Sequence, residues 1–162
     1  MSISFIFFTT IYSFTKSRFE IFLSERDSLS LPSKTNNMKI VLTPQESETF
    51  FFNSLCNGLG YVQGYGLELT YKEKDYKAAR KKLESPCFED VLMQILKDGK
   101  SLKMIDHECD GEYTREITLK DVHEKVQTTD AKWLLQMEHE EDDAVTADCI
   151  LQTVFFDEIV FG

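Results

Sequence analysis

The sequence lacks most of the motifs that mark common enzymes and metal-binding proteins. It contains no CxxC pair, which argues against a zinc ribbon and a thioredoxin-type site. It also contains no GxSxG, HRD or DFG motif, so the usual serine hydrolase and kinase patterns are absent. The acidic run at 138–143 does not have the DxDxDG spacing of an EF-hand calcium loop. No cofactor is therefore expected.

Basic charge and long apolar runs are also scarce. There are 18 basic against 28 acidic side chains, a formal charge of -10. Phosphate backbones attract clustered Lys and Arg, so we expect no direct nucleic-acid binding. The apolar stretch at 3–14 is shorter than the roughly 20 residues that span a bilayer, so no membrane span is expected. The 13 Phe and six Tyr supply enough apolar surface for one packed domain.

The first 37 residues differ in charge from the rest. They carry four basic and three acidic groups, whereas 38–162 carry 14 basic and 25 acidic groups. The first basic residue, Lys16, follows the apolar stretch, which does not fit a secretory signal. Because Met38 resembles an internal start, we expect 1–37 to be a non-native or disordered N-terminal extension. A membrane-associating leader and an extra strand or arm are the alternatives.

Residues 38–162 are expected to form a single α+β domain, with a small antiparallel sheet packed against about five helices. Thr43, Pro44 and Glu46 have the spacing of a capping box that begins a helix, and Asn57-Gly58 is expected to end it. Strands and helices are intermixed without regular alternation, which favours α+β over a doubly wound sheet. The other expected elements are a strand at 39–42, a strand at 67–71, and helices at 72–84, after 86, near 119–126, after 130, and after 143.

A hairpin is predicted at 102–107 and 113–118, around Asp110-Gly111. This dipeptide favours a two-residue type I′ turn, which would pair positions whose numbers sum to 221. Asp106 would then lie opposite Arg115, and His107 would point to the solvated face.

Two features suggest a partner-binding surface. The stretch 58–66 does not match GxGxxG, and we interpret it as a mobile connection whose tyrosines would contact a partner. The helix at 72–84 is basic, with a net charge of +4 over 72–82. Alternatively, it is a solvated helix that faces the protein's own acidic segments. The candidate contacts are Tyr61, Tyr65, Lys77, Arg80 and Lys81.

A metal-assisted enzyme is the alternative hypothesis. Its candidate ligands are His107, Glu108, Cys109 and His123, although His107 and Glu108 would point to opposite faces of the hairpin. Of the four cysteines, we expect only Cys109 to be exposed, because the other three fall in apolar helical patterns: Cys56, Cys87 and Cys149.

Three segments carry a resemblance: CFEDVLMQIL at 87–96, GEYTREITLKDVH at 111–123 and CILQTVFFDEIVFG at 149–162. They resemble small acidic uncharacterised proteins of bacteriophages and prophage regions, over 38–162 only. The resemblance implies no catalytic motif or ligand. We therefore expect a non-catalytic cytoplasmic protein with reduced thiols, which regulates or binds a protein partner not identified by the sequence. An acidic inhibitor that mimics nucleic acid is a further alternative.

Overall fold

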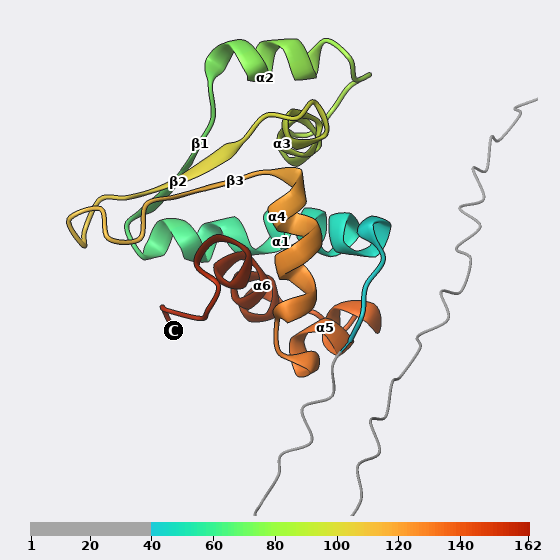
Figure 1. Ribbon diagram of the computed structural model, residues 1–162, viewed down its shortest axis with the longest axis vertical. Helices are drawn as coiled ribbons and strands as arrows, with labels where there is room; N and C mark the ends of the chain where they lie inside the picture. Colours follow the sequence, from blue (N-terminus) through green and yellow to red (C-terminus); the bar gives the residue numbers. More distant parts are fainter. Residues whose placement is uncertain (1–39) are drawn as a thin grey trace, which may run out of the picture.

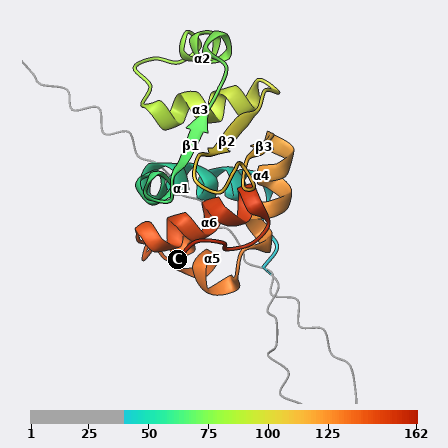
Figure 2. The ribbon, with the colours of Figure 1, turned by 90° about the vertical axis from the view of Figure 1, so that its left-hand side faces the viewer.

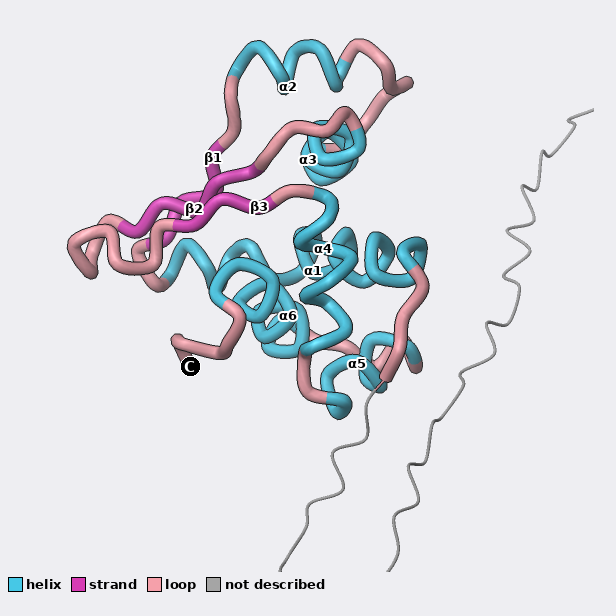
Figure 3. The backbone as a smooth tube through the Cα atoms, in the orientation of Figure 1, coloured by secondary structure: helices cyan, strands magenta, loops and turns pink. Residues whose placement is uncertain are grey.

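The computed structural model describes residues 40–162. These form an α+β fold of six α-helices, one 3₁₀-helix and a three-stranded antiparallel sheet of order β1-β2-β3 (Figures 1 and 3). The elements are α1 (Pro44–Gly64), β1 (Leu67–Thr70), α2 (Glu73–Arg80), α3 (Phe88–Lys97), β2 (Leu102–Asp106), β3 (Arg115–Ile117), α4 (Leu119–Lys125), η1 (Val126–Thr128), α5 (Ala131–Glu138) and α6 (Ala144–Phe156). The extension predicted at 1–37 lies outside the described residues. The prediction of a strand at 39–42 is wrong for the described residues 40–42, which join no sheet. Ile40 and Leu42 are nevertheless buried.

Helix α1 begins where the sequence predicts and ends later. The Thr43 hydroxyl accepts from the backbone N–H of Glu46, and the Thr43 N–H donates to the Glu46 carboxylate, which completes the capping box. The predicted end at Asn57-Gly58 is wrong, because the helix continues to Gly64. A Cβ on Gly58 would lie 3.0 Å from the backbone of Ala147, so this glycine allows α1 and α6 to approach closely.

The caps of the last three α-helices agree with the sequence. Thr118 and Asp121 form the cap of α4, and Asp130 accepts from the backbone N–H of Lys132 at the start of α5. Asp143 caps α6 by accepting from the N–H of Thr146. Short polar side chains satisfy the N–H groups that a helix start leaves unpaired, so the starts of these three helices depend on local sequence alone.

The predicted register of the hairpin is wrong, but the prediction of which side chains face the core is confirmed. Leu102 pairs with Ile117 and Met104 with Arg115, so the paired numbers sum to 219. Asp110 and Gly111 both have positive φ, as a type I′ turn requires, but the loop around them is longer than two residues. A shift of two residues keeps every side chain on its face, so Leu102 and Met104 are buried as expected.

The Asp106 carboxylate explains this difference. It does not face Arg115; instead it accepts from the backbone N–H groups of Glu108, Cys109 and Tyr113. These hydrogen bonds lower the pKa of Asp106, with the bond from Cys109 contributing most. The loop backbone is thereby bonded to a buried side chain, and the sheet ladder ends before it reaches the turn.

Helix α1 runs through the middle of the molecule (Figures 1 and 2). The sheet and α3 lie on one side of it, α5 and α6 lie on the other, and α4 crosses beside it. Helix α2 is outermost and packs on α3. No helix within 40–162 is long and apolar enough to cross a membrane.

Candidate interaction site

Helix α2 is short and depends on α3 for its stability. It covers 73–80 instead of the predicted 72–84, and Pro86 limits any continuation of the helix toward α3. Glu73 and Asp75 lie in its first turn and Arg80 in its last, which complements the helix dipole. Eight residues are too few for a helix that is stable alone, so the contact of Ala79 with α3 holds it in place.

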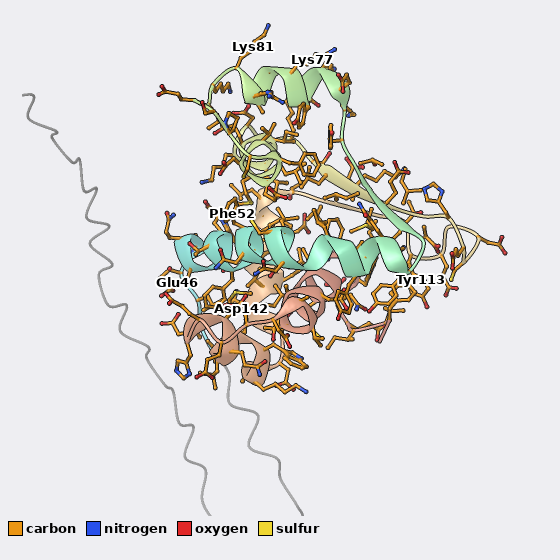
Figure 4. The ribbon with its side chains drawn as sticks, turned by 180° about the vertical axis from the view of Figure 1, so that it is seen from behind. Glu46, Phe52, Lys77, Lys81, Tyr113 and Asp142 are labelled. Carbon is orange, nitrogen blue, oxygen red and sulfur yellow. The ribbon has the colours of Figure 1, made fainter. Side chains whose placement is uncertain are left out.

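Most of the basic side chains in 72–82 are exposed and unpaired. Lys77 forms an ion pair with Glu73 in its own helix, at 3.0 Å, and Lys82 pairs with Asp98 at 2.6 Å. Within 40–162, the other four have no ion-pair partner: Lys72, Lys74, Arg80 and Lys81. The interpretation that the helix faces the protein's own acidic segments therefore holds only for Lys82. The predicted contacts Lys77 and Lys81 point away from the body of the molecule (Figure 4).

Three aromatic rings lie beside these cations. Tyr71 stacks on Tyr76 with ring centroids 4.8 Å apart, and Phe88 contacts both rings at 5.9 and 6.1 Å. Phe88 is the first residue of α3 and remains 38% exposed. Partly exposed aromatic rings next to unpaired cations are typical of a surface that binds a partner. We call residues 71–82 together with Phe88 the basic end.

A hollow of about 460 Å³ adjoins the start of α2. Lys72 and Lys100 line it together with Asp75 and Glu116, so its walls carry both signs of charge. The Glu116 carboxylate accepts a hydrogen bond from Ser101, which fixes one wall. The hollow gives the basic end a polar edge with room for the side chains of a partner.

The acidic segment 138–143 lies on the other side of α1 from the basic end (Figure 4, at Asp142). It joins α5 to α6, and none of its five carboxylates forms an ion pair with another part of 40–162. Burial raises the pKa of Glu138, and the nearby Glu46 raises it further. Glu140 and Glu141 are exposed, and Val145 beyond them is 41% exposed.

The two tyrosines predicted as contacts are not part of the basic end. Both lie near the end of α1, where Tyr61 is 43% exposed. Tyr65 is half-buried: its hydroxyl donates to Asp148 at 3.1 Å and its ring stacks on Phe161 at 5.0 Å. Burial and the Asp148 carboxylate raise the pKa of Tyr65 to about 12. Tyr65 therefore anchors the C-terminal residues to α6, and only Tyr61 is free to meet a partner.

The proposed metal ligands are not brought together. The His107 ring contacts Glu68 at 2.8 Å, whereas the His123 ring contacts Glu48 at 2.9 Å on another face. Glu108 lies against Gly66, and Cys109 is exposed in the loop after β2. Across 40–162, no group of three or more His, Cys, Asp or Glu side chains is placed to hold a metal ion.

The structure does gather one set of charged groups that the sequence analysis missed. Glu48 of α1 bonds His123 of α4 through one oxygen and Lys97 of α3 through the other, at 2.9 and 3.0 Å. Burial acts to raise the pKa of Glu48, but the bonds from His123 and Lys97 outweigh it and lower the pKa. Glu48 and Lys97 line a cavity of about 270 Å³ between α1 and α3.

This arrangement links three helices and is poorly suited to proton transfer. A general base works best with a pKa near the operating pH, and the lowered pKa of Glu48 moves it away from that range. Both of its oxygens are already bonded to side chains of the same protein, His123 and Lys97. No spacing in the sequence connects residues 48, 97 and 123, so only the packed structure identifies this group.

The cysteines are also unsuited to nucleophilic catalysis. Cys56, Cys87 and Cys109 are exposed and only Cys149 is buried, so the expectation for Cys56 and Cys87 is wrong. Cys87 lies at the start of α3, where its sulfur accepts from the N–H of Asp90. Partial burial and the Glu89 carboxylate raise the pKa of Cys56 to about 11, which disfavours the reactive thiolate.

Searches against protein-family models, curated proteins and solved structures found no match to this chain. The fold is therefore described by its own geometry, as an α+β domain with one basic end.

Proposed function

We propose that the protein acts by binding another protein, without catalysis, and that the basic end is its principal contact surface. The single observation that carries this proposal is the reversed charge of that end. Residues 40–162 carry 25 acidic and 13 basic side chains, yet six of those basic groups lie within 72–82. The partner is expected to offer carboxylates to the unpaired cations and an apolar side chain to Phe88.

Screening of distant charges and apolar contact both favour binding at the basic end. At 0.15 M salt, charges interact over about 8 Å, so a partner approaching α2 responds to the local positive charge more than to the distant acidic surface. Complementary charge speeds and orients such an encounter. The exposed ring of Phe88 adds apolar contact, which salt does not screen.

The setting proposed for this activity is the cytoplasm, in a protein of the phage or mobile-element type. Three exposed free cysteines support a reducing compartment, since exposed thiols are oxidised outside it. The resemblance over 38–162 supports the phage setting.

Binding of a defined probe tests the proposal. The probe is a fluorescent peptide of alternating Glu and Trp, and its counterpart has Lys in place of every Glu. We expect the full chain to bind the Glu peptide only, and R80E/K81E to weaken that binding roughly tenfold or more, because two attractions become repulsions. The matched control K103E/K120E changes the net charge equally, at two exposed lysines outside the basic end, and is expected to keep the affinity.

Phe88→Ala separates the apolar contribution. We expect it to weaken binding by the same factor at 0.1 and 0.5 M salt, because apolar burial does not depend on screening. Equal binding of the probe by wild type and R80E/K81E would contradict the proposal. Binding of the Lys peptide in place of the Glu peptide would also contradict it, and would assign the contact to an acidic surface.

A further inference from the structure

The basic end and the acidic segment 138–143 are complementary surfaces of one chain that do not meet within it. Residues 72–82 carry +4, and 138–143 carry five carboxylates and His139. Helix α1 lies between them, with Lys77 and Lys81 on one side and Asp142 on the other (Figure 4). The unpaired cations of α2 are therefore open to carboxylates of another molecule.

We infer that a second copy of this chain occupies the basic end, and that its acidic segment 138–143 contacts α2. This inference rests on the proposed function and names the partner for the same surface. The two surfaces also match in their apolar parts. Phe88 borders the basic end and Val145 borders the acidic segment, and both are exposed in the single chain.

Two-fold symmetry makes this contact in duplicate. When two copies lie antiparallel and side by side, α2 of each is brought next to 138–143 of the other, because the two surfaces lie toward opposite ends of the molecule. A closed two-fold pair satisfies both contacts at once, whereas a head-to-tail arrangement would leave one surface open and continue into a filament. The expected assembly is therefore an antiparallel dimer.

The salt concentration determines whether the local attraction between α2 and 138–143 exceeds the repulsion between two chains of the same net charge. The net charge of -10 on each chain opposes association, but at 0.1 M salt it is screened beyond about 10 Å. Contacts between α2 and 138–143 fall within that distance. At 1 M salt the range shrinks to about 3 Å, so the attraction is lost as well.

Light scattering and sedimentation of the full chain test the inference. At 0.1 M salt we expect a concentration-dependent rise in mass toward twice 18.8 kDa, and a dissociation constant at least roughly tenfold higher at 1 M salt. R80E/K81E lowers the net charge of 72–82 from +4 to zero, and E140K/E141K changes that of 138–143 from -5 to -1, so each variant is expected to remain a monomer. In an equimolar mixture of the two variants, one contact joins unchanged 72–82 to unchanged 138–143 and the other brings the two introduced Glu side chains against the two introduced Lys side chains, so a 1:1 dimer is expected.

Two matched controls exclude a general effect of net charge. K103E/K120E changes the charge as R80E/K81E does, and E112K/E158K changes it as E140K/E141K does, at exposed positions of other loops and elements. Both are expected to dimerise like wild type. Circular dichroism and the Tm of each variant establish that it is folded.

The possible failures are distinguishable from failure of the proposed function. A wild type that stays monomeric at 0.1 M salt overturns the inference, and so does a mixture of the two variants that stays monomeric. Dimers that persist in either single variant would place the contact elsewhere and overturn it too. The Glu peptide reports separately, since its binding to a monomeric wild type would support the proposed function while the inference fails.

Discussion

Helix α6 is buried along ten consecutive residues, 146–155, whereas α2 buries only Ala79. Helix α6 lies against α1, α4, α5 and β3, while α2 packs on α3 at the outer edge of the fold. The two helices also differ in their content of charged residues. Helix α6 contains one acidic residue, the buried Asp148, whereas most residues of α2 are charged and solvated. Substitutions in α6 should therefore change stability, and substitutions on the outer face of α2 should change binding.

The largest expected effect is a truncation in α6. Ile150 is fully buried, so Ile150→Ala removes apolar contacts and leaves a cavity, at a cost of about 2–5 kcal/mol in the free energy of unfolding. R80E/K81E on α2 should change that free energy by less than about 0.5 kcal/mol. Urea unfolding of both variants measures the contrast, and equal losses would remove the distinction between the two helices.

A second substitution asks whether α2 is a separate unit. Ala79→Asp places a carboxylate in the contact with α3, where an unpaired buried polar group costs about 1–3 kcal/mol. We expect amide exchange to become roughly tenfold faster or more at 73–80 while α1 and α6 keep their protection. The control is Ala78→Asp, because Ala78 is exposed on the same helix. Faster exchange throughout the chain would mean that α2 is part of the main cooperative unit.

Two glycines of α1 sharpen the contrast between packed and open helix surfaces. A Cβ at Gly58 would meet Leu151 at 2.9 Å and the backbone of Asp148 at 3.0 Å, whereas a Cβ at Gly60 meets nothing within 4 Å. Gly58→Ala is expected to destabilise the protein, since overpacking costs about 1–3 kcal/mol and helix propensity returns roughly 1 kcal/mol. Gly60→Ala is expected to stabilise it by about 0.5–1 kcal/mol. Thermal unfolding of the pair checks both signs.

The smallest effect concerns Glu48, which joins α1 to α3 and α4. Its pKa is lowered in the folded protein, so its stabilisation is complete above the usual value of 4.5 and is lost as the pH falls through the folded pKa. Wild type should therefore exceed Glu48→Gln in stability at pH 7, by less than about 1 kcal/mol, and the gap should narrow as the pH falls below 4.5. Urea unfolding at pH 7, 5 and 3.5 measures this, with the exposed Glu124→Gln as control. A constant gap would contradict it.

The sequence predicted helix starts better than helix ends. Thr43, Asp130 and Asp143 each cap a helix through a partner two or three residues away, so local sequence is sufficient. The end of α1 was predicted six residues early, because the contact of Gly58 with α6 depends on a segment about 90 residues away.

The candidate site was predicted in part. The charge of 72–82 is evident from the sequence, and the structure leaves Arg80 and Lys81 of that stretch exposed. The aromatic rings were missed because Phe88 meets Tyr71 and Tyr76 only when α3 turns back beside α2. The bond between Tyr65 and Asp148 was missed because the two residues are 83 positions apart.

Hydrophobic spacing, capping residues and charge counts fixed which segments become helices, which face of β2 is buried and where positive charge collects. These properties depend on neighbours within one or two turns, so they can be read along the chain. The strand register, the length of α1 and the separation of the basic end from 138–143 were decided by the tertiary structure. Each depends on contacts between distant segments, such as the three N–H groups that bond Asp106, and these form only when the core closes.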